Sequence, residues 1–170
     1  MTQNTIPLTQ MRLRELLHYD PMTGVFTRSE KSNRRVVIGA VASFNKNGRY
    51  ARVCVNNQRY YAHRLAWLYM YGAWPEDGLQ IDHIDGDKNN NKIANLRAAT
   101  PSANSQNERK ARPNSTSKLL GVHWSKNVSK WTAQIKIGPL HKCLGYFDDP
   151  VVAHNAYIAA KRIHHVGCTI

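Results

Sequence analysis

The stretch IDHIDGDKNNNKIANLRAATPSAN, residues 81–104, is a strongly polar segment, and its local signals determine the fold that we predict for this part of the chain. It contains three carboxylates, one histidine and five asparagines. Such a composition suits a polar surface loop, and it equally suits a site where side chains act on a substrate. Composition alone does not separate these two interpretations.

Local signals along this stretch predict a strand, a loop, a second strand and a helix. The apolar run GLQI leads into Asp82 and His83, and the Asp85-Gly86 pair that follows is a strong turn signal. NLRAAT, residues 95–100, has strand character, and Pro101 stands where a helix begins. Adjacent residues of a regular strand point to opposite faces, so only a bend would let Asp82 and His83 converge in distinct roles.

The predicted strand pair and helix can bring Asp82, His83 and Asn104 to one point. Asp82 and Asn104 then offer two hard oxygen ligands beside a neutral imidazole. Oxygen ligands suit Mg²⁺ or Mn²⁺, which keep bound water and accept a phosphate oxygen. The pattern favours a metal-assisted reaction at a phosphate group.

The segment DHIDGDKNNNKIANLRAATPSAN resembles the HNH motif of the ββα-metal nucleases. The preceding YYAHRLAWLYMYGAWPEDGLQ is similar to the lead-in of phage- and intron-encoded HNH homing endonucleases. The resemblance covers residues 8–107, including LLHYDPMTGVF. It implies a metal-dependent, site-specific DNA endonuclease that leaves 3′-hydroxyl and 5′-phosphate ends and uses one Mg²⁺ or Mn²⁺ per active site.

Residue by residue, the resemblance implies four roles. His83 is expected to be the general base, and Asp82 and Asn104 the metal ligands. Asn95 is expected to brace the intervening loop and to orient His83. The last ligand position of the motif holds asparagine here instead of histidine. The residue types agree with these roles, because a neutral imidazole can take a proton from water while one metal stabilises the leaving oxygen.

The other polar residues of the stretch are interpreted as scaffold. Asn and Asp are favoured in turns, so we expect turn or phosphate-facing positions for Asp85, Asp87, Asn89, Asn90 and Asn91. A calcium-binding loop is excluded, because the twelfth position counted from Asp85 is Leu96 instead of a bidentate glutamate.

The chain before this stretch predicts a small unit of helices and antiparallel strands. LTQMRLRELLH, residues 8–18, has helical spacing. RRVVIGAVASF and RYARVCVNNQRYY are strand-like runs with Asn-Gly and Asn-Asn turns, and HRLAWLYMYG then becomes helical and stops at Gly72. His63 and Arg64 stand at this strand-to-helix change, where a structural histidine and an accessory catalytic role are equally compatible with the pattern.

The chain after this stretch predicts a linker and a second module. SQNERKARPNSTSK, residues 105–118, has almost no apolar residues, and its Arg109, Lys110 and Arg112 are candidates to follow a DNA backbone. LLGVHW, KWTAQIKI and HKCLGYF predict three strands. DDPVVAHNAYIAAKRIHH predicts a helix that opens on Asp-Asp-Pro and ends in basic residues.

The second module alternates apolar and polar residues along KWTAQIKI, so one strand face packs against the helix and the other can meet DNA. Residues 117–168 resemble the APETALA, or ethylene-response-factor, DNA-binding domain, which lays a three-stranded sheet in the major groove. The resemblance implies DNA-facing positions at His123, Lys126, Lys130, Gln134, Lys136 and Lys142. Lysine mainly grips phosphate, whereas Gln134 can pair with an adenine edge.

The charge of the whole chain favours a polyanionic partner. Lys and Arg number 24 against 11 Asp and Glu, a formal net charge of +13. Double-stranded DNA is preferred over single-stranded RNA, because the exposed strand face holds Lys, Thr and Gln instead of aromatic residues. Cys54, Cys143 and Cys168 show no C-x-x-C pairing, so we expect buried free thiols and no structural zinc.

Neither a leader sequence nor a membrane-spanning apolar run is present, so we expect an intracellular protein without a membrane partner, in the host cytoplasm if it is phage-encoded. The predicted fold class is α+β. It comprises an HNH nuclease domain at residues 1–107 with its core at about 79–107, a basic linker at 108–116, and a domain at 117–170 with a three-stranded antiparallel sheet on one helix.

Two functions stay open on these patterns. The first is a homing-type DNA endonuclease, and the alternative is a non-catalytic, sequence-specific DNA-binding regulator that uses the C-terminal sheet. No obligate protein partner is expected. A monomer would nick one strand, and a homodimer would cut both.

Overall fold

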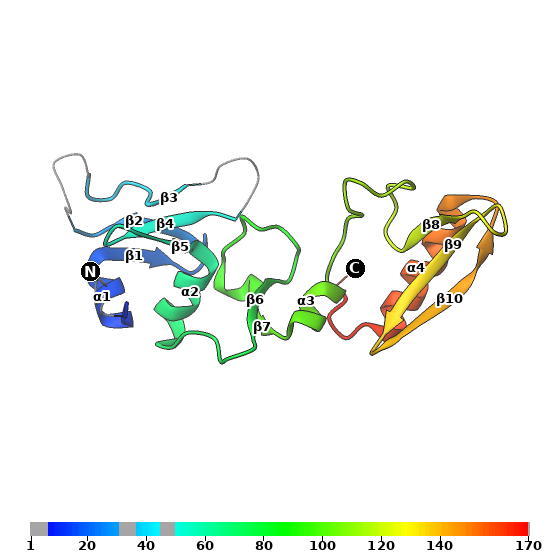
Figure 1. The fold of residues 1–170 in the computed structure, drawn as a ribbon. Coiled ribbons are helices and arrows are strands. Elements are labelled where there is room, and N and C mark those ends of the chain that lie inside the picture. Colours follow the sequence, from blue (N-terminus) through cyan, green and yellow to red (C-terminus); the bar gives the residue numbers. More distant parts are fainter. Residues whose placement is uncertain (1–6, 31–36, 45–49, 170) are drawn as a thin grey trace, which may run out of the picture. The chain divides into compact units, whose positions relative to one another are not determined.

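The computed structural model describes residues 7–30, 37–44 and 50–169. They belong to two compact units, residues 1–100 and 101–170. Helices and small antiparallel sheets occur in both, so the predicted α+β class is confirmed (Figure 1). The predicted Asn-Gly turn and the first residues of RRVVIGAVASF lie outside the described residues.

The first unit opens with helix α1, Gln10–Leu16, whose N-cap Thr9 accepts a hydrogen bond from the backbone N–H of Arg12. The sequence predicts a helix to residue 18, and that boundary is wrong. The chain leaves the helix at Leu17 and forms strand β1, Leu17–Asp20, which pairs antiparallel with β2, Val25–Arg28. Backbone pairing across the hairpin thus overrides the helical spacing of the side chains.

A three-stranded antiparallel sheet follows, with the order β3-β4-β5. Its strands are β3, Ser43–Phe44, β4, Arg52–Val55, and β5, Gln58–Tyr61. The Asn-Asn turn between β4 and β5 is confirmed, with both asparagines at positive φ. The described part of RRVVIGAVASF is mostly turn and contributes only β3 to the sheet.

Helix α2, Ala62–Tyr71, begins directly after β5 and ends at Gly72 as predicted. Gly72 has a φ of 78°, a left-handed conformation that glycine adopts without steric cost, and its N–H donates to the carbonyl of Leu68. Leu65 and Leu68 of this helix join Leu13, Leu17 and Phe26 in the buried core of the first unit.

The predicted order of strand, loop and strand is confirmed for the polar stretch. Strand β6, Gln80–His83, pairs antiparallel with β7, Leu96–Ala99, and a short 3₁₀ turn η1, Ile93–Asn95, precedes β7. Ile81 and Leu96 anchor the pair in the core of the first unit.

The second unit begins with α3, Pro101–Gln106, and then forms the predicted three-stranded sheet on one helix. The strands are β8, Val122–Ser125, β9, Lys130–Ile137, and β10, Leu140–Phe147, in the antiparallel order β10-β9-β8. Helix α4, Pro150–His164, lies along one face of the sheet (Figure 1), and its N-cap Asp149 accepts the N–H of Val151 at 2.7 Å.

Helix α3 and the segment predicted as a linker are held by the C-terminal end of the chain. The N–H of Gly167 donates to Gln106 Oε1 at 3.1 Å, the buried Lys161 donates to the carbonyl of Glu108, and Arg109 donates to the carbonyl of Thr169 at 3.0 Å. These contacts tie α3 and the segment after it to the second unit, residues 101–170, and the predicted domain end at residue 107 stays a prediction.

The three cysteines are free thiols, as expected, but they are not buried. Cys143 is exposed, and Cys54 and Cys168 are half-buried. Within residues 7–30, 37–44 and 50–169, no helix has both the length and the apolar character needed to cross a lipid bilayer.

Candidate active site

Asp82 and His83 lie at the end of β6, and both are buried, with exposed fractions of 7% and 3%. The strand stays paired through His83, where Asp82 lies opposite Arg97 and His83 opposite Leu96. Neighbours in a strand point to opposite faces, so the two side chains meet different surroundings. A buried polar pair of this kind is more informative than exposed polarity, because burial of such groups is costly unless they have partners.

One partner of Asp82 is Arg97. Both contacts go to one carboxylate oxygen, Oδ2, from Nε at 3.0 Å and from Nη2 at 2.9 Å. The register explains the pairing, because residues directly opposite on antiparallel strands share a face. Sequence reasoning did not single out Arg97, although its position in the second strand of the motif was a usable signal.

A partner of His83 is the buried side chain of Asn91. His83 Nε2 lies 3.1 Å from Asn91 Oδ1. The sequence predicts only a turn or phosphate contact for Asn91, so its place beside the imidazole is new information. No periodicity distinguishes the third asparagine of the run from the two before it, which explains why the sequence did not reveal it.

Asn95 braces the loop between the strands. Its Oδ1 accepts the N–H of Asp85 at 3.0 Å, and its Nδ2 donates to Asp85 Oδ1 at 2.9 Å and to the carbonyl of Asn90 at 2.8 Å. Partial burial raises the pKa of Asp85, but hydrogen bonds from Asn90, Asn95 and the Asp87 N–H outweigh burial and leave the pKa below its ordinary value. The loop is therefore held by its own polar groups, while Asn91 contacts His83.

His63 of α2 packs against His83. The two ring centroids are 5.1 Å apart in an edge-to-face arrangement, and Tyr61 stacks on His63 at 5.5 Å. Burial, followed by the neighbouring His83 and Arg64, lowers the pKa of His63 to about 3, and its Nδ1 has no hydrogen-bond partner. His63 is thus a buried neutral imidazole beside the predicted general base. His63 lies three residues before Ala66, which is also buried, and this helical spacing places both on the inner face of α2.

Tyr50 completes the aromatic surroundings of this site. Its ring lies 5.0 Å from that of His63 and 5.9 Å from that of His83, and Lys88 Nζ sits 5.0 Å from the Tyr50 ring centroid. Burial, and secondarily the charge of Asp82, raises the pKa of the Tyr50 hydroxyl. No sequence signal pointed to Tyr50, because it comes from a segment distant from β6.

The predicted metal pair, Asp82 and Asn104, is divided between the two units, because Asn104 lies on α3. Its role as a ligand stays a prediction. Among the residues that the structure describes, no group of three or more His, Cys, Asp and Glu side chains could hold a metal ion. The proposed donors nevertheless fit a hard divalent cation by their chemistry, since carboxylate and amide oxygens are what Mg²⁺ and Mn²⁺ accept alongside water.

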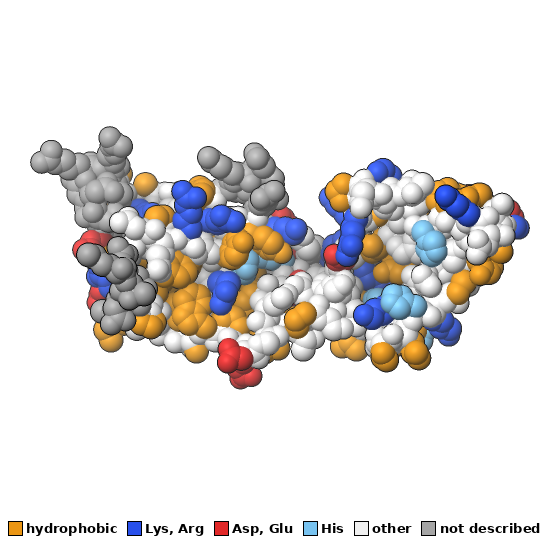
Figure 2. Space-filling view, in the orientation of Figure 1, with side chains coloured by type: hydrophobic (Ala, Val, Ile, Leu, Met, Phe, Trp, Pro, Cys, Tyr) orange, Lys and Arg blue, Asp and Glu red, His pale blue; other side chains and the backbone are white. Residues whose placement is uncertain are grey.

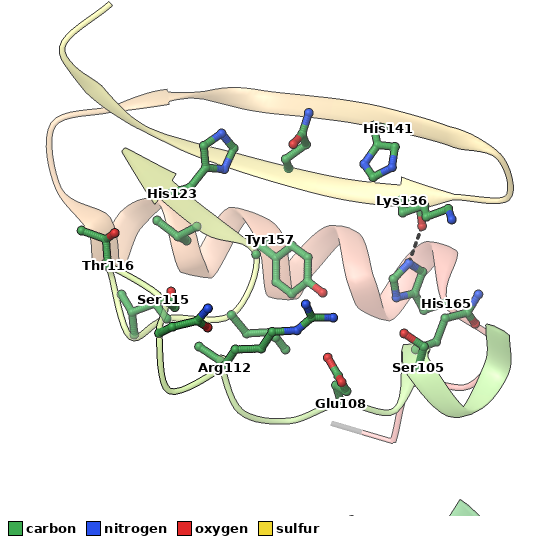
Figure 3. Close-up of a pocket in the computed structure, with 18 of the residues that line it drawn as sticks. Ser105, Glu108, Arg112, Ser115, Thr116, His123, Lys136, His141, Tyr157 and His165 are labelled. Atoms are coloured by element: carbon green, nitrogen blue, oxygen red, sulfur yellow. Dashed lines mark hydrogen bonds between the residues drawn. The ribbon is translucent and has the colours of Figure 1, made fainter. Parts of the chain in front are cut away.

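In the second unit, several residues predicted to bind DNA surround one cavity of about 850 Å³. Arg112 of the irregular segment, His123 of β8, and Gln134 and Lys136 of β9 all line it. Figure 3 shows Arg112 beside Tyr157 and the strand residues His123, Lys136 and His141 on the opposite side, with His165 Nε2 bound to the carbonyl of Lys136 at 2.7 Å.

The strand register divides the remaining predicted DNA-binding residues. His141, which the sequence did not single out, pairs with Lys136 and shares its polar face. The predicted Lys142 pairs with the core residue Ile135 and shares that face of the sheet, although its own side chain is exposed. Lys130 Nζ is 3.1 Å from Asp148 Oδ1, and both side chains are exposed.

Lys126 lies in the turn after β8, and Lys110 is exposed in the irregular segment between α3 and β8. On the face drawn in Figure 2, lysine and arginine side chains occur over both units, while aspartate and glutamate are few.

Comparison with known proteins shows that the segment around the site is similar to a nuclease family. Residues 60–106 match the family model described as HNH endonuclease. Protein 3.8 of Escherichia phage T7 is 40% identical over 73 residues, which cover 43% of this chain and 59% of that protein. No solved structure matches the chain. The segment matched by the family model, residues 60–106, includes β6, β7 and the loop between them. The candidate site on β6 therefore lies inside this HNH-like segment.

Proposed function

We propose that this protein is a metal-dependent DNA endonuclease whose active site is built on β6, with His83 as the general base. The observation that supports the proposal most strongly is the burial of Asp82 and His83 at the end of β6, inside the HNH-like segment. Each has a specific partner, Arg97 for the carboxylate and Asn91 for the imidazole. Buried polar side chains with specific hydrogen-bond partners are typical of catalytic residues.

The chemistry follows from these groups. His83 takes a proton from the water that attacks the phosphodiester, as a neutral imidazole can near neutral pH. Asn91 holds the ring while it does so, and Arg97 holds the carboxylate of Asp82. Asp82 and Asn104 are the proposed ligands of one Mg²⁺ or Mn²⁺, which would neutralise charge at the phosphate and at the leaving 3′ oxygen.

The second unit is proposed to bind duplex DNA through the polar face of its sheet, in the manner of the APETALA-like domain that it resembles. The cavity lined by Arg112, His123, Gln134 and Lys136 supports this proposal, because cationic and amide side chains converge there. Linking a weak binding module to a nuclease raises the effective concentration of the active site near its target. The homing-type role is proposed from the resemblance of the sequence to phage- and intron-encoded HNH homing endonucleases, and the phage relative is consistent with a phage origin.

The test is cleavage of genomic DNA from the source of the protein. The purified full chain is incubated with this DNA and Mg²⁺, and the ends are mapped on both strands, with a chelator in a parallel reaction. The proposal predicts discrete ends that carry 3′-hydroxyl and 5′-phosphate groups and disappear with the chelator. Specific binding without any cleavage would instead identify a DNA-binding regulator, and the endonuclease proposal would be wrong.

A further inference from the structure

The contact between His83 and Asn91 determines more than the position of the ring. His83 Nε2 and Asn91 Oδ1 are 3.1 Å apart, and the two residues are only 3% and 4% exposed. A neutral imidazole carries its proton on one of two nitrogens, and the neighbour of each nitrogen decides which. The identity of the Asn91 atom that faces His83 is therefore decisive.

The orientation of the Asn91 amide is set by its other hydrogen bond. Asn91 Nδ2 donates to the carbonyl of Asn89 at 3.1 Å, and a carbonyl can only accept. The amide nitrogen therefore points to Asn89, and the amide oxygen points to His83. Because this oxygen is also only an acceptor, His83 Nε2 must carry the hydrogen, and Nδ1 carries the lone pair.

The backbone of Asn91 is anchored by the hairpin of β1 and β2. The buried hydroxyl of Tyr19 donates to the Asn91 carbonyl at 2.6 Å. Gly24, in the hairpin turn at a φ of 76°, lies so close that a Cβ there would be 2.5 Å from the Asn91 carbonyl carbon and from the Lys92 nitrogen. The N–H of Ile93 donates to the carbonyl of Pro21 at 3.3 Å. The hairpin thus grips the backbone on both sides of Asn91.

We propose that Asn91, clamped by Tyr19 and Gly24, is the positioning residue of the general base, and that it commits His83 to the Nε2–H tautomer so that Nδ1 accepts the proton of the attacking water. The catalytic consequence rests on the proposed endonuclease function, but the tautomer itself does not. The proposal also gives the hairpin, which lies outside the HNH-like segment, a part in the reaction.

The first test measures the tautomer in the unmodified protein. The full chain is labelled with ¹⁵N-histidine, and the imidazole nitrogens of His83 are observed by NMR without metal at mildly alkaline pH, where imidazole is neutral. A His83→Gln variant identifies its signals among those of the eight histidines. We expect the proton on Nε2. A proton on Nδ1, or a mixture of both tautomers, would overturn the proposal whether or not the protein cleaves DNA.

The second test removes the hydrogen-bond acceptor. Asn91→Leu should lose the uniform Nε2–H signal and lower kcat by about 10–100-fold with little change in KM, because Asn91 acts through His83. Asn91→Asp keeps an acceptor and should restore the Nε2–H signal. An Asn91→Leu variant that folds, keeps the Nε2–H signal and cleaves at the wild-type rate would contradict the proposal.

The third test probes the hairpin. Tyr19→Phe removes one hydroxyl and should lower kcat several-fold, and Gly24→Ala should lower it further because of the close approach. Met22→Ala, in the same turn but highly exposed, is the matched control and should retain wild-type kcat. If Tyr19→Phe matches the control in both kcat and the His83 spectrum, the hairpin has no positioning role. If no variant or wild type cleaves DNA, the NMR results still decide the tautomer.

Discussion

Arg97 holds one carboxylate oxygen of Asp82 through two nitrogens, with Nε at 3.0 Å and Nη2 at 2.9 Å from Oδ2. The two residues are direct partners in the register of β6 and β7, so the pairing of the strands places the cation next to the carboxylate. Asp82 is nearly buried while Arg97 is partly exposed, so the guanidinium both neutralises the carboxylate and covers it.

Arg97→Ala should lower the free energy of unfolding by about 1–3 kcal/mol, because it leaves a buried carboxylate without its charged partner. Arg97→Lys should cost less, since it keeps the charge and loses only the two-nitrogen contact. Urea denaturation of the full chain measures both values. Added Mg²⁺ should restore more stability in Arg97→Ala than in the wild type if Asp82 binds the metal. Equal responses to Mg²⁺ would argue against Asp82 as a ligand.

His63 should make the first unit sensitive to acid. Its pKa is lowered to about 3 by burial, then by His83 and Arg64, whereas an unfolded histidine keeps its ordinary pKa of about 6.5. The stability that neutral His63 contributes is present in full above about pH 6.5 and is lost as the pH falls toward 3. The free energy of unfolding then decreases by up to about 1.4 kcal/mol for each pH unit.

Urea denaturation between neutral and mildly acidic pH measures this loss. His63→Phe, which keeps an aromatic ring, should flatten the pH dependence, and His18→Gln, at an exposed histidine, should retain the wild-type slope. An unchanged slope in His63→Phe would mean that other groups cause the acid sensitivity.

Asn95→Ala should loosen the loop between β6 and β7 without unfolding the unit, because it removes three hydrogen bonds to Asp85 and Asn90. We expect faster amide hydrogen exchange in residues 85–90 and cleavage about tenfold slower. Lys92→Ala, at a neighbouring exposed position, is the control. Cleavage at the wild-type rate despite faster exchange would show that the rigidity of the loop is not needed.

Lys136→Ala should weaken DNA binding and reduce the slope of log K against log salt concentration by about one. The reason is that Lys136 lies on the polar face of the sheet beside the cavity. Lys142→Ala should change the slope less, since the register places Lys142 on the opposite face of the sheet from Lys136. Titrations at several salt concentrations measure both slopes. Equal slopes for the two variants would contradict the assignment of the polar face as the DNA-binding face.

The regular elements of this chain could be predicted because their signals are local. The strand predicted for KWTAQIKI has the bounds of β9, and Asp149 and Pro150 begin α4 as expected. The predicted alternation holds from Ala133 to Lys136, whereas Thr132, expected on the exposed polar face, is buried. Gly72 ends α2 for the same kind of reason. Where a local signal competed with pairing, as at Leu17, the hairpin determined the structure and the helix prediction ran too far.

The partners within the candidate site could be predicted only in part. Asp82 and His83 stand out by their type and place in the motif, but Asn91, His63 and Tyr50 reach His83 through tertiary packing from other segments. Only His63 carried a usable signal, its spacing along an apolar helix face. The hydrogen bond from Tyr19 to Asn91 spans 72 residues, and no periodicity encodes such a contact.

The central claim, that His83 is the base of a DNA endonuclease, is tested most directly by comparing cleavage by the wild type and by His83→Ala in Mg²⁺, with the ends mapped on each strand. His18→Ala, at an exposed histidine, controls for the loss of an imidazole elsewhere. We predict discrete ends from the wild type and from His18→Ala, and a rate at least about 100-fold lower for a folded His83→Ala. Cleavage by His83→Ala at the wild-type rate would contradict the claim.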